Sequence, residues 1–280
     1  MNAPLPFMPR VEPFFFDAEP GTRFSLYHAP NPQVPARGAI LYIHPFAEEM
    51  NKTRRMAALQ ARAFAALGFS VLQIDLFGCG DSCGDFSSGR WDLWKRDLGV
   101  ACDWLAGRSS GPLQLWGARL GGLLALDFAA SRQVDGVILW QPFIDGRTCI
   151  NQFLRLRLAA GMDDADAPRS TAALRAELAA RGRLEVAGYE LDAAMVRGID
   201  ACDAARLKPL PCTVHWFASG APAARKIASS AARLAERWAP LGVALHFHPV
   251  DGVPFWATGD IAECPALLAA TAGVFAPIAS

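Results

Sequence analysis

The sequence predicts an α/β protein in which helices cover both faces of a mostly parallel central sheet. Short apolar runs that are typical of buried strands alternate with longer segments of helical period from about residue 37 onward. The chain has 280 residues, of which 52% are hydrophobic, and this is enough to form one large core. One stretch of about 68 residues breaks the alternation, which indicates an insertion.

Seven apolar runs are expected to form the strands. They are Arg23–Tyr27, Ala39–His44, Ser70–Asp75, Leu113–Trp116, Gly136–Trp140, Thr213–Ala218 and Val243–His248. Three segments between them carry apolar residues on one helical stripe, so they are expected to connect consecutive strands as right-handed crossovers. These helices are expected at Lys52–Leu67, Trp91–Leu105 and Gly121–Ser131.

The interrupting stretch runs from Phe143 to Leu210 and contains no clear strand. Its helical patterns lie at Gln152–Ala160, Ala172–Arg181 and Leu191–Ala205. A compact domain seldom leaves this length without secondary structure, so we expect a helical cap over one end of the sheet. The prediction divides the chain into a core, formed by residues 1–142 and 211–280, and a cap formed by residues 143–210.

Composition and charge exclude several classes of function. The 27 basic and 27 acidic residues cancel, and no basic run could neutralise several phosphates, so nucleic-acid binding is not expected. We expect no signal peptide in Met1–Phe16, and the apolar tract Pro265–Ala279 is too short to cross a bilayer. Seven cysteines form no CxxC pair and no disulfide framework. These features predict a cytoplasmic protein without a membrane span.

The segment Trp116–Gly122, with the sequence WGARLGG, has the form of a nucleophile elbow. In such a G-x-S-x-G turn, glycines two before and two after the central residue relieve crowding between a strand and the following helix. The central position holds Arg119 instead of a serine, cysteine or aspartate. A guanidinium stays protonated and has no lone pair with which to attack, so Arg119 is not a nucleophile.

At this point the chain resembles the α/β-hydrolase superfamily. The resemblance is carried by Ala39–Phe46, by the turn Ile74–Ser82 and by the elbow. The chain is also similar to one subgroup, the exosortase A system-associated hydrolase 2 proteins, at Glu48–Lys52, Leu72–Asp75 and Leu139–Pro142. The resemblance implies an α/β-hydrolase fold and a bacterial cytosolic protein of loci for exopolysaccharide synthesis and protein sorting, with a protein partner in that system.

The family frame implies a triad whose acid and histidine follow later strands, and the sequence lacks both. No acidic residue follows Thr213–Ala218 directly, and Val253 or Pro254 stands where the histidine is expected. In related enzymes two backbone N–H groups form an oxyanion hole, and Leu120 and Phe46 occupy those positions here. The usual His-Gly of that loop is His44-Pro45, which removes one donor.

Arg119 allows two interpretations. It could receive an anion beside a helix N-terminus, so that a small acidic ligand or an acyl compound binds under the cap. It could instead form a buried ion pair with Asp145, Glu48 or Asp81 that fills a disused pocket. Trp256 is a candidate to line this pocket, although aromatic residues at such spacings are also common in cores.

Other residues are weaker candidates for chemistry. His246 and His248 share one face of a strand, but no third ligand is near in sequence, so we expect no metal site and no cofactor. A reactive thiol would need a lowered pKa, and the family frame places no histidine beside Cys79 or Cys83. The cluster Lys52–Arg55 is either a solvated helix face or an attractor for an acidic ligand.

Two functional hypotheses follow. In the first, the protein has lost conventional serine chemistry and acts as a non-catalytic or anion-binding component of an exopolysaccharide and protein-sorting system. In the second, it hydrolyses esters, thioesters or peptides with a nonstandard nucleophile, for which Cys79, Ser82 and Cys83 are the candidates.

Overall fold

The computed structural model describes residues 8–161, 169–219 and 221–275, with the backbone alone for residues 221–227. Residues 1–7 of the segment tested for a signal peptide, and residues 276–279 of the C-terminal apolar tract, lie outside this part. Among the helices that are described, none combines the length and the apolar character needed to cross a membrane.

An eight-stranded sheet forms the centre of the molecule, in the order β1-β2-β4-β3-β5-β6-β9-β10. The strands are β1 (Val11–Asp17), β2 (Thr22–His28), β3 (Ala39–Ile43), β4 (Ser70–Ile74), β5 (Leu113–Ala118), β6 (Gly136–Trp140), β9 (Thr213–Ser219) and β10 (Ala244–Val250). Strands β4 to β10 run parallel in this order, whereas β1 and β2 form an antiparallel edge. The predicted mostly parallel sheet is therefore confirmed.

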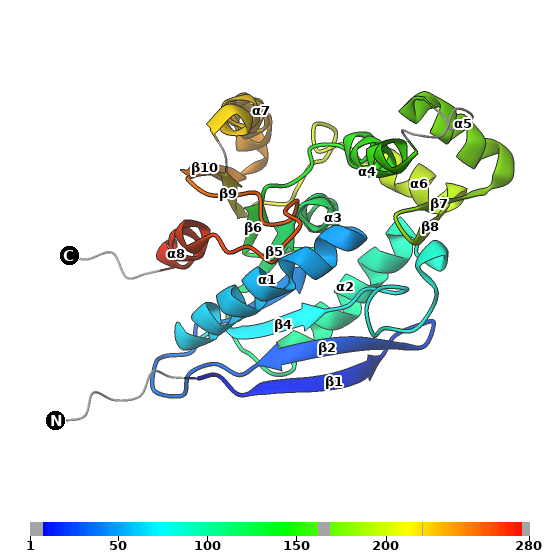
Figure 1. Ribbon diagram of the computed structural model, residues 1–280. Helices are drawn as coiled ribbons and strands as arrows, with labels where there is room; N and C mark the ends of the chain where they lie inside the picture. The colour runs from blue at the N-terminus through cyan, green and yellow to red at the C-terminus, as the bar shows by residue number, and fades with distance from the viewer. Residues whose placement is uncertain (1–7, 162–168, 220, 276–280) are drawn as a thin grey trace.

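Helices cover both faces of the sheet, as the sequence predicts (Figure 1). On one face lie α1 (Glu48–Ala66) and α8 (Pro265–Gly273), and on the other lie α2 (Trp91–Ala106), α3 (Leu120–Ala129) and α7 (Ala221–Trp238). Successive strand residues point to opposite faces, so Ile40 and Tyr42 pack with α1 while Leu41 and Ile43 pack with α2 and α3. Two short 3₁₀ helices, Phe86–Ser88 and Ala239–Leu241, complete this part.

The segment between β6 and β9 forms a separate group of elements beside the carboxyl ends of the strands (Figure 1). It contains α4 (Gly146–Ala160), α5 (Thr171–Arg181), the hairpin of β7 (Arg183–Val186) and β8 (Tyr189–Asp192), and α6 (Ala193–Asp200). The helix expected at Leu191–Ala205 is shorter in the structure, because α6 begins at Ala193 and ends at Asp200. Asp192 accepts hydrogen bonds from the backbone N–H groups of Ala194 and Met195, so it caps α6 and ends the strand before it.

Two further strand regions escape the sequence pattern. Strand β1 contains Pro13, a residue that argues against a ladder strand, but β1 is an edge strand, where proline is tolerated. The run Phe14–Phe16 was the available signal. The strands β7 and β8 have four residues each, too few to show a period.

Candidate functional site

The turn between β5 and α3 has the strained backbone of an elbow. Arg119, at its apex, has φ 55° and ψ −119°, a backbone conformation that residues other than glycine rarely adopt. Space around it is so limited that a Cβ on Gly117 would lie 2.4 Å from the Gly121 carbonyl oxygen. One on Gly121 would lie 2.3 Å from the Ile43 oxygen. Glycine is therefore required at both positions.

Arg119 forms a buried ion pair with Glu49. Its Nε donates to both carboxylate oxygens at 3.2 Å, and Nη2 donates to Oε1 at 3.1 Å. The two side chains are only 8% and 12% exposed. The guanidinium also lies 4.1 Å from the ring centre of Phe143 and 4.9 Å from that of Trp256, so two aromatic faces contact the cation.

A second strained turn brings Glu49 to Arg119. Ala47 has φ 51° and ψ −129°, almost the conformation of Arg119, and α1 begins directly after it. Glu48 and Glu49 thus lie in the first turn of α1, where the helix dipole favours negative charge. Burial raises the pKa of Glu49, while the charge and hydrogen bonds of Arg119 act in the opposite direction.

The predicted partners of Arg119 are wrong. Asp145 caps α4 instead, because its carboxylate accepts from the Thr148 backbone N–H at 2.7 Å and from the Thr148 hydroxyl at 2.8 Å. Glu48 points elsewhere, and its buried Oε2 has no hydrogen-bond partner among the described residues. Burial raises the pKa of Glu48, and the neighbouring charge of Glu49 adds to the effect. The structure gives no ion pair between Asp81 and Arg119 within its described part.

Two further residues, from the loop after β10 and the end of β6, contact Arg119. The Trp256 ring, in the loop after β10, lies 4.9 Å from the guanidinium, two residues beyond Pro254. Gln141, which follows β6, accepts a hydrogen bond from Arg119 Nη1 through its carbonyl oxygen at 3.2 Å. Its side-chain oxygen accepts from the Ser219 backbone N–H at 2.8 Å, so the ends of β5, β6 and β9 are tied together.

The cavity beside the elbow is almost filled. His44, Phe46 and Leu120 line it together, but its volume is only about 10 Å³, close to the minimum for one water molecule. Phe46 packs against Phe86 and Phe153 with ring centres 5.2 and 5.3 Å apart. A second cavity of about 40 Å³ lies under α4, where Glu48 and Phe46 are part of the lining. Of the predicted pocket residues, His44, Phe46 and Leu120 line the first cavity and Phe46 and Glu48 the second, while Arg119, Asp145 and Trp256 line neither.

Comparison with known proteins establishes the family. The family model described as serine aminopeptidase, S33 (Hydrolase_4) matches residues 34–208, more than half of the chain. The chain belongs to this family of α/β hydrolases. The match does not reach the exosortase-associated subgroup, which stays a prediction. Among curated proteins, no sequence matches significantly.

Several solved structures share the fold of this chain. Est1E from Butyrivibrio proteoclasticus with ferulic acid bound is 14% identical, with a TM-score of 0.64 over 94% of this chain and 96% of that chain. The hypothetical protein PA2218 from Pseudomonas aeruginosa is 15% identical, with a TM-score of 0.63 over 98% and 95%. XC6422 from Xanthomonas campestris, described as a serine hydrolase without a lid, is 15% identical, with a TM-score of 0.55 over 95% and 92%. At these identities the likeness shows the fold alone.

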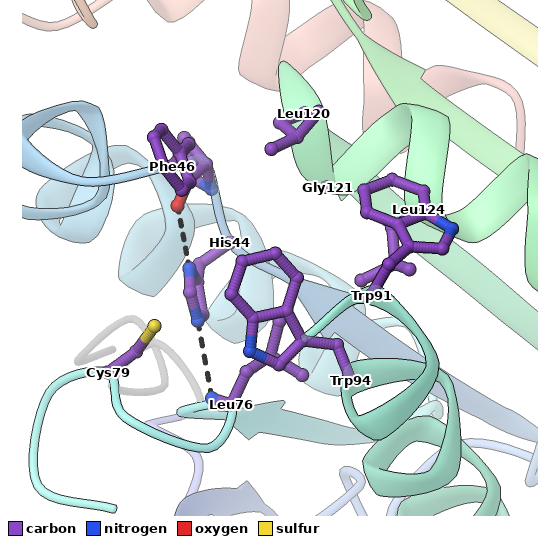
Figure 2. A pocket seen from close by; sticks show the side chains of 10 residues that line it. His44, Phe46, Leu76, Cys79, Trp91, Trp94, Leu120, Gly121 and Leu124 are labelled. Atoms are coloured by element: carbon purple, nitrogen blue, oxygen red, sulfur yellow. Dashed lines mark hydrogen bonds between the residues drawn. The ribbon is translucent and has the colours of Figure 1, made fainter. Parts of the chain in front are cut away.

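In this α/β hydrolase, Cys79 and His44 line the same small cavity (Figure 2). The sequence places no histidine near this thiol. The imidazole is nevertheless occupied, since Nδ1 donates to the Pro45 carbonyl oxygen at 2.7 Å and Nε2 accepts from the Leu76 backbone N–H at 3.3 Å. Burial lowers the pKa of His44 and raises the pKa of Cys79, so the thiol stays protonated at neutral pH.

The other two candidate nucleophiles hold the turn after β4 in shape. The Ser82 hydroxyl donates to the Asp75 carbonyl oxygen and accepts from the Phe24 backbone N–H. The Cys83 thiol donates to the Pro20 carbonyl oxygen at 3.1 Å. Among the described residues, no imidazole is hydrogen-bonded to either group, so neither is activated for attack.

Three histidines gather on β9 and β10 instead. His215 Nδ1 lies 3.0 Å from His248 Nε2, and the His246 ring stacks on His215 with centres 5.2 Å apart. Burial, together with the charges of the two neighbours, lowers the pKa of His215 to about 4. In the part of the chain that the structure describes, no three His, Cys, Asp or Glu residues are grouped to hold a metal ion.

The Lys52–Arg55 cluster divides between different partners. Arg54 pairs with Asp75 at 3.4 Å, and Arg55 pairs with Glu263. The Thr53 hydroxyl donates to the Glu49 carbonyl oxygen at 2.7 Å. The cluster therefore does not present one basic surface at the elbow.

Proposed function

We propose that this α/β hydrolase acts by binding rather than by turnover, as a non-catalytic component of an exopolysaccharide and protein-sorting system in the cytoplasm. The observation that carries the proposal is the buried ion pair of Arg119 and Glu49 at the apex of the elbow. Acyl transfer needs a nucleophile, an adjacent base and a group that orients the base. At this elbow, the guanidinium of Arg119 contacts the carboxylate of Glu49 and the indole ring of Trp256 instead.

The geometry supports the ion-pair interpretation of Arg119 over the anion-receptor interpretation. Glu49 compensates the charge, and the guanidinium also donates to the Gln141 carbonyl and to Gln152 Oε1 at 3.3 Å. An acidic ligand would have to displace a buried carboxylate from a bidentate contact, which charge-assisted hydrogen bonds oppose. The elbow thus serves as a closed structural unit, and other surfaces carry recognition.

The assignment to an exopolysaccharide and protein-sorting system rests on the sequence resemblance at Glu48–Lys52 and Leu139–Pro142. These segments include the residues that close the elbow, Glu49 and Gln141. The motifs that carry the resemblance and the groups that remove catalysis are therefore partly the same residues.

One experiment separates binding from hydrolysis. The purified protein is treated with a fluorophosphonate probe and with p-nitrophenyl ester and thioester substrates, beside a heat-denatured control. We expect no labelling and no turnover. The variant Arg119→Ser is expected to stay inactive too, because a serine hydroxyl needs an adjacent histidine as its base, and no described histidine contacts Arg119.

A cysteine hydrolase is the second candidate, favoured by the shared cavity of His44 and Cys79. Thioester turnover that disappears in Cys79→Ala and persists in Cys83→Ala would overturn the binding proposal in its favour. A complementary test uses the organism of origin. If the protein acts by binding, a strain that carries Cys79→Ala should produce as much exopolysaccharide as the parent, whereas a strain that lacks the protein should not.

A further inference from the structure

A much larger cavity lies away from the elbow, between α1 and the strands β2, β3 and β4. Its volume is about 190 Å³, against about 10 Å³ beside the elbow. Cavities of roughly 150 Å³ are large enough to hold benzene in an engineered protein. Neither Arg119 nor Glu49 lines it, although His44 forms a wall that it shares with the small cavity. Space for a small molecule therefore exists in this fold, but on the α1 side of the sheet.

The lining of this cavity combines apolar and polar side chains. Apolar side chains come from β2, β4 and α1, including Leu26, Met50 and Ala58. The polar residues of the lining are Tyr42, His44, Arg54, Gln73 and Asp75. A ligand in this space would contact both apolar surface and a few hydrogen-bonding groups, which is the general composition of small-molecule sites.

The polar side chains without a full set of partners can each donate a hydrogen bond. Tyr42 is 5% exposed, its ring is packed against Trp116, and its hydroxyl has no hydrogen-bond partner among the described residues. Burial raises the pKa of Tyr42, so its hydroxyl keeps its proton. The Gln73 side-chain oxygen is hydrogen-bonded to His28 Nε2 at 2.8 Å, and its amide nitrogen makes no hydrogen bond to the described residues.

Arg54 adds positive charge at the edge of the cavity. Its side chain is 43% exposed, and Nη2 reaches Asp75 at 3.4 Å while Nε reaches Asn51 Oδ1 at 3.4 Å. Both contacts are long, and Nη1 makes no hydrogen bond to the described residues. Asp75 also lines this wall, and its Oδ2 accepts from Arg54 at 3.4 Å and from the Asp81 backbone N–H at 3.0 Å. The donors that remain on Arg54, Tyr42 and Gln73 therefore favour a ligand that carries hydrogen-bond acceptors.

We infer that this cavity binds a small carboxylic acid with a compact apolar body. The carboxylate takes hydrogen bonds from Arg54, Tyr42 and Gln73, and the body lies on Leu26, Met50 and Ala58. The charge of Arg54 selects an acid over the matching amide, since a charge-assisted hydrogen bond is stronger than a neutral one. The site does not depend on the elbow, so it exists whether or not the protein is a catalyst.

Titration calorimetry of the full chain with benzoate and with hexanoate tests this inference, and benzamide and hexanamide serve as neutral isosteres. We expect at least one acid to bind and its amide to bind about tenfold more weakly or not at all. Arg54→Gln is expected to weaken acid binding by about tenfold, and Ala58→Leu, which fills the apolar side, to abolish it. Arg55→Gln is the matched control, because Arg55 is the next residue on α1 and pairs with Glu263 instead.

Several results overturn the inference. The inference is wrong if neither acid binds in the millimolar range, or if the amides bind as tightly as the acids. It is also wrong if Arg55→Gln weakens binding as much as Arg54→Gln does, because that outcome would show a general charge effect. Each variant is first checked by circular dichroism. The half-exposed Arg54 can be replaced without disturbing the core, so Arg54→Gln keeps the test valid even if Ala58→Leu is misfolded.

Discussion

Two arginines of this protein are buried in ion pairs, and they differ in what surrounds them. Arg23 of β2 pairs with Asp97 of α2 at 2.8 Å, with side-chain exposures of 0% and 1%. Arg119 pairs with Glu49 at 3.1 Å, with exposures of 8% and 12%. Each guanidinium also lies over an aromatic ring, Phe77 for Arg23 and Phe143 for Arg119.

The first pair fastens elements together. Arg23 Nη1 donates to the Pro20 carbonyl oxygen at 2.8 Å, and Asp97 accepts from the Phe77 backbone N–H at 2.8 Å. The second pair stands on a strained backbone, because Arg119 has φ 55°. Backbone strain of this kind persists only where the surrounding structure imposes it. In the α/β-hydrolase fold, the strained turn at this place is the one that presents the nucleophile in active enzymes. The comparison indicates that the Arg23 pair connects elements of the core, while the Arg119 pair lies at the apex of the elbow.

Asp97→Ala should have the largest effect. It leaves the fully buried Arg23 without a counter-charge and removes the acceptor of the Phe77 N–H, so we expect a loss of about 4–5 kcal/mol of unfolding free energy. Denaturant unfolding measures it. Asp103→Ala is the control on the same helix, since Asp103 is 69% exposed and pairs with a half-exposed Arg132; it should cost less than about 1 kcal/mol. Equal losses of unfolding free energy in the two variants would show that the Arg23–Asp97 pair does not stabilise the fold more than an exposed pair does.

The elbow pair should respond unequally to removal of its two partners. Glu49→Gln keeps a hydrogen-bond acceptor but leaves the charge of Arg119 buried, so we expect a loss of about 3 kcal/mol. Arg119→Met leaves a carboxylate that can take up a proton, since burial already raises the pKa of Glu49, and should cost only about 1–2 kcal/mol at neutral pH.

The same asymmetry gives a pH test. In Arg119→Met the folded state holds a proton on Glu49 more tightly than the unfolded state does, so stability should rise as the pH falls through the raised pKa. Unfolding of this variant at a series of pH values measures the slope relative to the parent. A greater loss for Arg119→Met than for Glu49→Gln at neutral pH would contradict the proposed origin of the effect.

Much of this fold can be predicted from the sequence, because the decisive signals are local. Apolar runs predict the parallel strands, and the glycines at 117 and 121 predict the elbow, since no Cβ fits there. The hairpin of β7 and β8 could not be predicted, because four residues show no period. The cap of α6 by Asp192 was a usable signal for the end of β8.

The site was only half predictable, for a geometrical reason. The motif exposes Arg119, but its partner lies 70 residues away in the chain. The sequence hypothesis named three candidate partners, of which Glu48 is one residue from the true partner Glu49. Neighbouring residues of a helix point in directions about 100° apart. Glu49 therefore reaches Arg119 at the elbow, whereas Glu48 does not. The strained Ala47 sets where α1 begins, and no sequence pattern shows that conformation.

Acid should act on the molecule through its histidines rather than through either ion pair. Burial raises the pKa of both Glu49 and Asp97, whereas the charges of Arg119 and Arg23 act in the opposite direction. For His215, burial and the two neighbouring histidines all lower the pKa. Its pKa is lowered from about 6.5 in the unfolded chain to about 4 in the folded one, so the unfolded state binds the extra proton between these values.

Stability should therefore be insensitive to His215 above about pH 7 and should fall as the pH drops from about 6.5 towards 4. His215→Gln removes this titration. The pKa of the neighbouring His248 is also lowered by burial, and that group remains in the variant. Denaturant unfolding of both proteins across this range should give a shallower slope for the variant, by at most about one proton. The effect is the smallest of the series, because His215 is partly solvated. Identical slopes would place the acid response elsewhere, with the two buried carboxylates as the next groups to substitute.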